Sequence, residues 1–175
     1  MISTLIIYSS TDGQTIKISE EIASVIKNNN SVKLASLDQI DMYDLNSYDQ
    51  LIIGASIRYG KHKPELYNFI KKNIAVLENK ENAFFSVNVV ARKPEKNNPE
   101  TNPYMQKFLK LSQWKPNNLQ VFAGKIDYPK YKFIDKYMIR FIMWITKGPT
   151  DLKGSFEFTD WNKVNKFANQ LVLKN

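Results

Sequence analysis

Hydrophobic residues along the chain form five short runs that are separated by stretches with helical spacing. The runs are apolar and rich in β-branched or aromatic residues, which is typical of strands buried on both faces of a sheet. They lie at residues 4–8, 32–35, 50–54, 83–87 and 119–124. Strands that alternate with helices predict an α/β fold with a doubly wound, five-stranded parallel sheet in the order 2-1-3-4-5.

Four amphipathic stretches predict the helices that cover this sheet. The first follows Gly13 and ends at the asparagines of residues 28–30. The second begins at Pro64, because proline is favoured in the first turn of a helix, and the third spans about 103–112. Thr159 and Asp160 are the predicted caps of a last helix that runs through Leu173.

Residues 125–154 interrupt the alternation and are predicted to form an insert before a last strand segment at 156–158. A connection of roughly 30 residues is too long for an ordinary loop, which indicates a function. Residues 133–147 fit a helix on which Lys136, Arg140 and Lys147 share one narrow wedge and apolar residues cover most of the remaining circumference. Such a helix suits a membrane surface or an apolar ligand pocket. The alternative is a helix packed on its own sheet.

The composition excludes several kinds of chemistry. The 175 residues, 43% of them hydrophobic, suit a single domain. There is no cysteine and one histidine, His62, which excludes disulfides, thiolate catalysis and the usual zinc or iron–sulfur ligands, so no metal site is predicted. Redox chemistry would need an organic cofactor. No apolar run reaches the roughly 18 residues of a membrane span, and no signal peptide is recognised, so we expect a cytoplasmic protein.

The net charge of +8 is distributed unevenly. Residues 1–50 have 3 basic and 7 acidic side chains, whereas residues 51–150 have 18 basic and 7 acidic ones. This asymmetry indicates a basic face that meets an anionic partner. The alternative is compositional drift, since the chain has 22 lysines, 18 asparagines and 18 isoleucines. Drift accounts for the total charge better than for its position.

The first predicted strand leads into a hydroxyl-rich loop, Ser-Ser-Thr-Asp-Gly-Gln-Thr at residues 9–15, and a helix follows at once. A phosphate monoester there would meet backbone N–H groups and the positive end of the helix dipole. Serine and threonine hydroxyls donate hydrogen bonds without adding charge, and Gly13 lets the backbone approach closely. The loop therefore predicts a phosphate site, although an ordinary cluster of helix-capping residues has the same composition.

This loop resembles the FMN-phosphate loop of flavodoxins. Two further segments lie where flavodoxins place the loops beside the flavin ring: Gly-Ala-Ser-Ile-Arg-Tyr-Gly at 54–60 and Ser-Val-Asn-Val-Val-Ala-Arg-Lys-Pro-Glu-Lys at 86–96. The resemblance implies a flavodoxin-like fold with FMN as cofactor. The implied cofactor-binding residues are Ser9, Ser10, Thr11, Asp12, Gly13, Gln14, Thr15, Ala55, Ser56, Ile57, Arg58, Tyr59, Gly60, Ser86, Val87, Asn88, Val89, Val90, Ala91 and Arg92.

The ring-loop segments, with Ser-Gln-Trp at 112–114 and Thr-Asp-Trp at 159–161, are similar to the flavodoxin-like, menaquinone-dependent protoporphyrinogen IX oxidases of bacterial haem biosynthesis. The similarity covers nearly the whole chain. It implies an enzyme whose FMN takes reducing equivalents from protoporphyrinogen IX and passes them to menaquinone or another quinone. Because such a quinone resides in the bilayer, we expect an anionic membrane surface as a partner, on the cytoplasmic side of the inner membrane.

The chain has only three arginines, and they are the candidates for substrate contact. Arg58 and Arg92 lie in the ring-loop segments and Arg140 in the insert. A guanidinium binds a carboxylate through two parallel hydrogen bonds, and the implied substrate carries two propionates; the alternative is chance placement on the surface. Tyr59 is expected to stack on the flavin ring or to be a half-buried loop residue. His62 is expected to be an exposed loop histidine, and no catalytic residue is assigned.

Three other functions are compatible with parts of the pattern. A generic NAD(P)H:quinone reductase would share the fold, but no segment marks a nicotinamide site. An electron-shuttle flavodoxin is typically acidic, whereas this chain is basic. A nucleic-acid binder would need aromatic residues interleaved with basic ones on adjacent strands. That arrangement is not found, so no nucleic-acid partner is expected.

Overall fold

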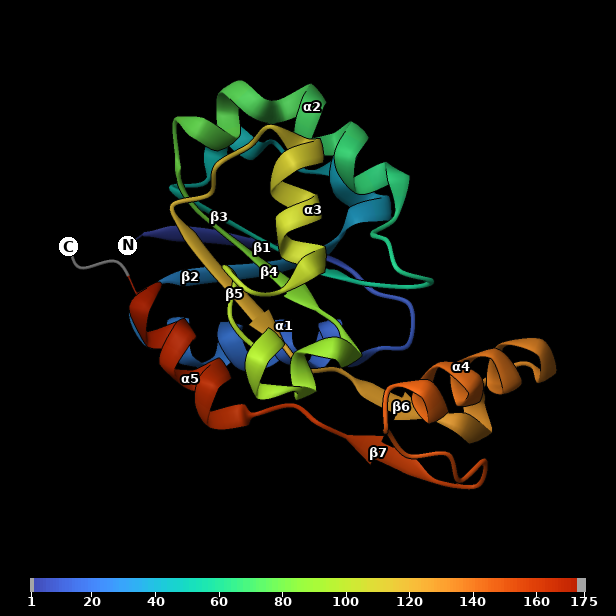
Figure 1. The fold of residues 1–175 in the computed structure, drawn as a ribbon. Helices are drawn as coiled ribbons and strands as arrows, with labels where there is room; N and C mark the ends of the chain where they lie inside the picture. Colours follow the sequence, from blue (N-terminus) through green and yellow to red (C-terminus); the bar gives the residue numbers. More distant parts are fainter. Residues whose placement is uncertain (1, 173–175) are drawn as a thin grey trace.

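The computed structural model describes residues 2–172 and has a five-stranded parallel sheet at its centre (Figure 1). The strands follow the order β2-β1-β3-β4-β5, which confirms the predicted topology. All five predicted strands are present, each extended or shortened by one or two residues. They are β1 (Ser3–Ser9), β2 (Ser31–Ser36), β3 (Gln50–Ser56), β4 (Glu81–Val87) and β5 (Asn118–Phe122).

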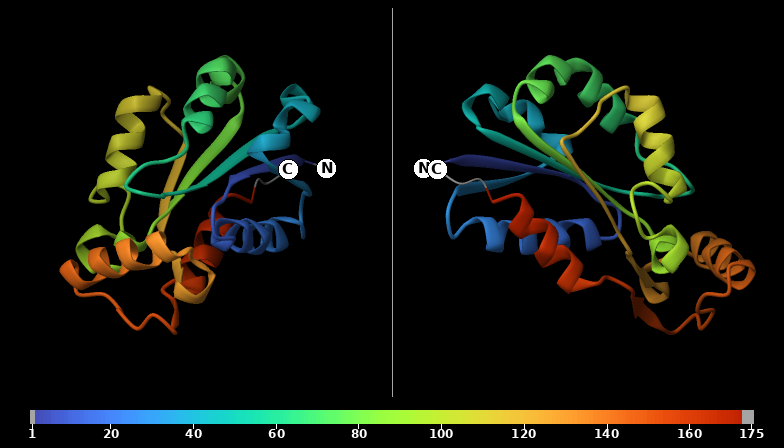
Figure 2. Two further views of the ribbon diagram at one scale, coloured as in Figure 1. Left: turned by 90° about the vertical axis from the view of Figure 1, so that its right-hand side faces the viewer. Right: turned by 60° about the vertical axis from the view of Figure 1, so that its left-hand side comes forward.

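Two helices cover each face of the sheet (Figures 1 and 2). Helices α1 (Gln14–Ile26) and α5 (Trp161–Gln170) lie on one face, and α2 (Pro64–Glu78) and α3 (Pro103–Ser112) on the other. Asp160 caps α5 as predicted, because its side chain accepts a hydrogen bond from Lys163 N. This helix ends at Gln170, and Leu173, where it was expected to end, lies outside the described residues.

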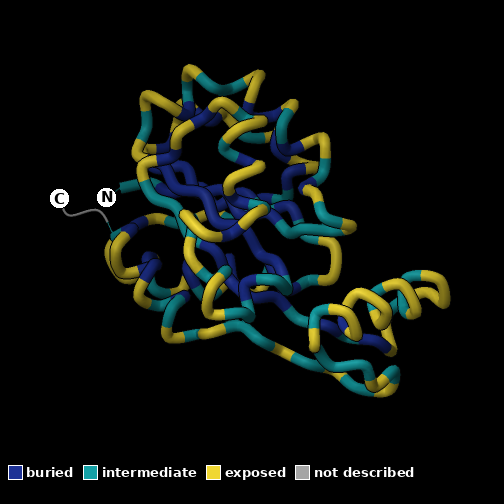
Figure 3. Tube along the Cα trace, in the orientation of Figure 1, coloured by how far each residue is buried: buried dark blue, intermediate teal, exposed yellow. Residues whose placement is uncertain are grey.

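Buried residues form two cores, one on each side of the sheet. Figure 3 shows that the buried positions concentrate along the strands of the sheet. The strand β3 is buried along almost its whole length, as its continuous apolar run predicted. Packing around it is close: a Cβ atom on Gly54 would stand 2.1 Å from Cζ of Phe85. Because the strands are parallel, β1, β3 and β4 all end at the same edge, and the three loops singled out in the sequence meet there.

Residues 125–157 form a separate unit beside this edge, which we call the insert unit. It contains β6 (Lys125–Asp127), a 3-10 turn η5 (Tyr128–Lys130), α4 (Phe133–Ile145) and β7 (Ser155–Glu157). A strand forms at the segment expected after the insert, but β7 pairs antiparallel with β6 in a two-stranded ribbon and not with the main sheet. Phe158 N donates to Gly124 O over 3.1 Å, so the chain leaves the unit beside the point where it enters.

The helix of the insert unit ends two residues earlier than predicted. Lys147 adopts a left-handed conformation with φ of 55°, and Gly148 N donates to Met143 O over 2.7 Å. This pair of features is a helix-terminating motif. Lys136 and Arg140 therefore share the helical wedge that the sequence predicted, whereas Lys147 lies beyond the helix.

Most of α4 faces solvent. Of its 13 residues only Met143 is buried, and the helix lies away from the five-stranded sheet (Figures 1 and 3). The helix is thus not packed on the five-stranded sheet, and its one buried residue, Met143, packs with Ile126 and Tyr128 of the insert unit. The exposed large hydrophobic residues of α4 are Phe133, Ile134, Tyr137, Met138, Phe141, Ile142, Trp144 and Ile145.

Candidate functional site

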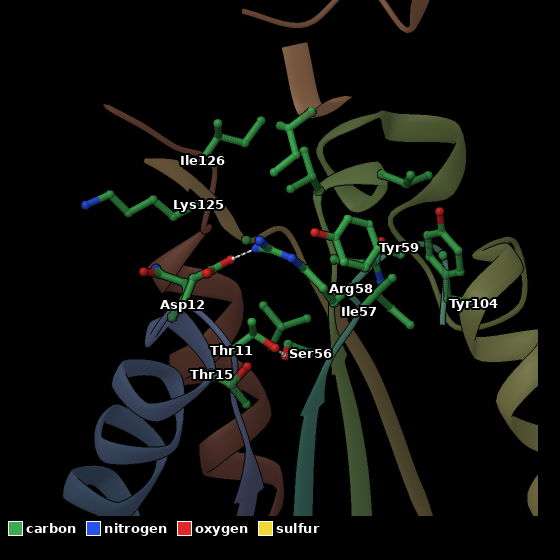
Figure 4. A pocket seen from close by; sticks show the side chains of 18 of the residues that line it. Thr11, Asp12, Thr15, Ser56, Ile57, Arg58, Tyr59, Tyr104, Lys125 and Ile126 are labelled. Carbon is green, nitrogen blue, oxygen red and sulfur yellow. Dashed lines mark hydrogen bonds and ion pairs between the residues drawn. The ribbon is translucent and has the colours of Figure 1, made fainter. Parts of the chain in front are cut away.

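A cavity of about 400 Å³ opens where the carboxyl edge of the sheet meets the insert unit (Figure 4). Fourteen of the sequence-predicted residues line it: Ser10, Thr11, Asp12, Gln14, Thr15, Ser56, Ile57, Arg58, Tyr59, Gly60, Val87, Asn88, Val89 and Val90. Six lie in the same loops but outside the lining: Ser9, Gly13, Ala55, Ser86, Ala91 and Arg92. The volume falls within the roughly 300–1,000 Å³ of small-molecule sites.

The loop after β1 leaves polar groups turned toward the cavity. Gly13 has a φ of 89°, a conformation that favours glycine, and its N–H donates to Ser10 Oγ over 3.1 Å. Helix α1 starts directly after it without a side-chain cap. Thr15 Oγ1 is buried, lines the cavity and has no hydrogen-bond partner among the described residues. A buried hydroxyl without a partner is costly, which indicates that a ligand completes it.

The loop after β3 turns sharply beside the cavity. Arg58 and Lys61 exchange two backbone hydrogen bonds, of 3.0 and 3.2 Å. Tyr59 and Gly60 between them both have positive φ, of 50° and 74°, which is the geometry of a tight two-residue turn. The turn holds the Tyr59 ring at the cavity with half of its surface exposed. The stacking of this ring on a flavin stays a prediction.

Arg58 connects three segments around the cavity. Its Nη1 lies 2.8 Å from Asp12 Oδ2 (Figure 4). Its Nη2 lies 3.0 Å from Asp135 Oδ2, at the start of α4. Tyr59 OH also donates to Asp135. Although burial opposes the charge, Asp12, Tyr59 and Asp135 together raise the pKa of Arg58. The hydrogen bond from Tyr59 and the Arg58 charge in turn lower the pKa of Asp135.

The loop after β4 is organised by two buried asparagines. Asn88 Oδ1 accepts hydrogen bonds from Ala91 N at 3.0 Å and from Asn102 Nδ2 at 3.1 Å. Asn102 also caps α3 by accepting from Tyr104 N and Met105 N. These bonds hold the start of α3 beside the loop, and Tyr104 therefore joins the cavity wall.

The other two candidate arginines lie outside the cavity lining. Arg92 donates from Nη1 to Val89 O at 3.1 Å, and from Nη2 to Thr146 O and Oγ1 at 2.9 and 3.0 Å. Arg140 is exposed on α4 and borders a shallow hollow with Tyr137, Phe141 and Trp144. Of the three arginines, Arg58 is the one whose side chain reaches the cavity.

His62 is a core residue, so the expectation of an exposed loop histidine is wrong. Its side chain is 2% exposed and packs edge-on against Phe84 and Phe108. Its Nε2 lies 3.1 Å from Ser86 Oγ. Burial, with a smaller effect of Lys107, lowers the pKa of His62 to about 4. The imidazole is therefore neutral at physiological pH.

Two cavity residues escaped the sequence analysis, and six residues of the insert unit complete the wall. Tyr104 lies in the first turn of α3, and Gly124 follows β5. The helix-capping Asn102 before Pro103 could have indicated the start of α3 and hence the place of Tyr104. The insert unit contributes Lys125, Ile126, Tyr131, Ile139, Ile142 and Met143, all within the segment 125–154 that was expected to have a function. The site thus joins a hydroxyl-rich, anion-binding end to a largely apolar chamber, which suits a phosphorylated ligand with a flat apolar body.

Comparison with known proteins agrees with this geometry. Residues 5–153 match the flavodoxin domain family. The chain is 42% identical over 170 residues to protoporphyrinogen IX dehydrogenase (quinone) of Escherichia coli K12, covering 97% of this chain and 94% of that protein. It is 41% identical over 170 residues to the Leishmania major protein of the same name, covering 96% and 74%.

Solved flavodoxin structures share the fold. Oxidised flavodoxin 1 from Bacillus cereus superposes with a TM-score of 0.54 at 16% identity, with 97% of each chain covered. A short-chain flavodoxin associated with a bacterial microcompartment superposes with a TM-score of 0.57 at 14% identity, covering 98% of this chain and 97% of the other. At such identities the likeness concerns the fold alone.

Burial of His62 predicts a specific loss of stability in acid. The unfolded chain binds a proton near the ordinary pKa of about 6.5, whereas folded His62 resists protonation until about pH 4. The contribution is therefore fully present above pH 6.5 and is lost as the pH falls toward 4. Between pH 7 and 4.5 we expect the free energy of unfolding to fall by about 2–3 kcal/mol more in the wild type than in His62→Gln. Urea denaturation at both pH values measures this difference. NMR titration of the single imidazole gives the pKa directly, and a midpoint near 6.5 would contradict the burial.

Proposed function

The chain belongs to the flavodoxin domain family, in the group that contains the protoporphyrinogen IX dehydrogenases (quinone), and on that basis we propose that it is such a dehydrogenase. It oxidises protoporphyrinogen IX to protoporphyrin IX with FMN as cofactor and a quinone as electron acceptor. The observation that carries this proposal is the cavity, where a hydroxyl-rich loop meets an apolar chamber closed by the insert unit.

The residues at the cavity fit the phosphate end of FMN. Thr15 Oγ1 lacks a hydrogen-bond partner among the described residues, and Thr11 Oγ1 has a long contact of 3.4 Å with Ser56 Oγ. Ser10 lines the cavity beside them. These hydroxyls, with the N-terminal amides of α1, would hold a dianionic phosphate. The nearby carboxylate of Asp12 would repel it, but Arg58 neutralises that charge at 2.8 Å.

The apolar part of the cavity suits the ring systems of cofactor and substrate. When bound, FMN supplies the capacity to take electron pairs from a reduced carbon compound and release them to a quinone. Ile57, Val89 and Val90 from the loops after β3 and β4 line the chamber together with Ile139 and Ile142 from α4. Such walls exclude water from the reacting groups. Protoporphyrinogen IX loses six electrons and six protons in all, so three quinones become quinols for each porphyrin.

Arg58 is the best-placed candidate for a substrate propionate. It lines the cavity, and its guanidinium stacks 5.1 Å from the ring of Tyr59 and 5.2 Å from that of Tyr131. Because its two carboxylate partners already exceed its single charge, an incoming propionate would bind by displacing one of them from the fork. Arg140 is a candidate from outside the cavity, where it would meet a propionate that reaches the rim.

We also propose that α4 lies on the membrane surface and that the acceptor is menaquinone, which resides in the bilayer. Among residues 2–172 no helix combines the length and the apolar character that crossing a membrane requires. The exposed face of α4 instead offers Phe133, Ile134 and Trp144, which are 76%, 76% and 69% exposed. Lys132, Lys136 and Arg140 flank these side chains. Apolar side chains beside cations are the features of a helix that lies in an anionic lipid interface, on the cytoplasmic side of the membrane.

The phosphate assignment predicts a loss of affinity when hydroxyls are removed from the loop after β1. In Thr11→Val with Thr15→Val, the phosphate loses hydrogen-bond donors, and one bond to a charged group contributes about 1.5–3 kcal/mol. We expect FMN to bind one per chain to the wild type and at least about tenfold more weakly to the variant. FAD should bind more weakly than FMN, because no pyrophosphate motif is present. Fluorescence titration measures both, with Thr101→Val, an exposed threonine before α3, as control. Equal FMN affinity in the double variant and the control would refute the assignment.

The catalytic proposal predicts porphyrin formation by the FMN-loaded chain. Under anaerobic conditions, protoporphyrinogen IX and a quinone should give protoporphyrin fluorescence, with three quinols formed per porphyrin. Free FMN with the same reagents is the control for uncatalysed oxidation. A rate no higher than that control would show the proposal to be wrong. If NADPH reduced the quinone instead, the chain would be a NAD(P)H:quinone reductase, and a shuttle flavodoxin would show neither reaction.

The membrane proposal predicts binding to anionic vesicles through α4. Replacing Phe133 and Trp144 by serine removes two large apolar groups, each of which contributes about 1.5–3 kcal/mol when buried. We expect the wild type to co-sediment with anionic vesicles more than with neutral ones, and the variant to bind at least about tenfold more weakly. Leu111→Ser, on the exposed face of α3, is the matched control and should bind like the wild type. A wild type that stays in the supernatant would exclude this role for α4.

A further inference from the structure

Helix α4 contributes little to any hydrophobic core, yet its inner face closes the cavity. Ile139, Ile142 and Met143 line the chamber, and of these only Met143 is buried. A helix with so few buried side chains is positioned weakly by apolar packing. Its place over the cavity must depend on other contacts, and these are found at its two ends.

The first attachment is at the start of α4. Asp135 accepts a hydrogen bond from Tyr59 OH and forms the 3.0 Å ion pair with Arg58 Nη2. Arg58 simultaneously pairs with Asp12 at 2.8 Å. A carboxylate in the first turn also meets the positive end of the helix dipole. One guanidinium thus connects α4 with the loops after β1 and β3.

The second attachment is at the end of α4. Arg92 Nη2 lies within 3.0 Å of both Thr146 O and Thr146 Oγ1, while Nη1 binds Val89 O. The last carbonyls of a helix lack partners and carry negative partial charge, so a guanidinium is favourable there. Gly148 makes room for it, since a Cβ at that position would lie 3.0 Å from Arg92 Nη2 and 2.6 Å from Met143 Sδ.

We propose that Asp135 and Arg92 are positioning residues that hold α4 over the cavity from its two ends. Each end of α4 is held by a guanidinium that makes several bonds. Arg58 binds two carboxylates at once, and Arg92 binds three oxygens on two segments. The planar fork of arginine reaches such sets, and a lysine ammonium at one point does not. That this attachment of α4 matters for catalysis rests on the proposed function, whereas the attachment itself does not depend on it.

Hydrogen exchange of the FMN-loaded full chain tests the proposal without reference to activity. Arg92→Lys keeps the charge and loses the fork, and Asp135→Asn removes the ion pair. In each variant we expect amides 137–145 to exchange about tenfold faster, as loss of one bond to a charged group implies. Amides of the five-stranded sheet should keep their wild-type rates. Arg140→Lys, on the same helix but without a hydrogen bond or ion pair among the described residues, is the matched control and should exchange like the wild type.

Unchanged exchange of α4 in Asp135→Asn and Arg92→Lys would overturn the proposal. If Arg92→Lys also speeds exchange in the five-stranded sheet, the result for Asp135→Asn alone decides between the outcomes. The carboxylate of Asp135 is partly exposed and is not part of the core. The kinetic readout is an increased KM for protoporphyrinogen IX in both variants, with FMN affinity within about threefold of wild type, because the phosphate loop is intact. Faster exchange in a chain that oxidises no porphyrinogen would leave the attachment established and the proposed function refuted.

Discussion

The arrangement of this site depends on the pairing of β1 with β3. Both strands are parallel, buried and in register, with Ile6 opposite Ile52 and Ser9 opposite Ala55. Because β1 also pairs with β2 on its other side, the chain leaves the sheet in opposite directions from this point, and a crevice forms at the strand ends. The anion-binding loop after β1 and the tight turn after β3 are neighbours for that reason, although they are separated by more than forty residues in sequence.

The electrostatics of the crevice follow from a balance of few charges. In the proposed phosphate site, hydroxyls and helix amides would attract the phosphate without a permanent cation, so the one carboxylate in the loop, Asp12, would be unfavourable if unpaired. Arg58 offsets the charge of Asp12 through Nη1 and pairs with Asp135 through Nη2. The same guanidinium is shared by the polar end of the cavity and the apolar helix above it. One side chain, Arg58, therefore contacts both regions.

The sequence predicted the regular part of the fold well and the insert unit only in part. Apolar runs and helical spacing are local signals, and they located every strand of the main sheet and each helix within a few residues. The partner of β7 is not a local property, because its pairing depends on where the chain re-enters at Gly124. His62 was misjudged for a related reason: its neighbours in sequence are polar, but Phe84 and Phe108, which enclose it, come from β4 and α3. Tyr104 likewise reaches the cavity through the contact between Asn88 and Asn102.

The hydrogen bond from Phe158 N to Gly124 O also bears on how such a protein arises. It places the two ends of the insert unit side by side, at the end of the last strand of a sheet that is complete without it. Because the two ends of the insert unit lie side by side, a change in its length costs the rest of the chain little entropy. The strand order and the loop after β1 can therefore stay as they are while the insert unit, and with it one side of the cavity, changes.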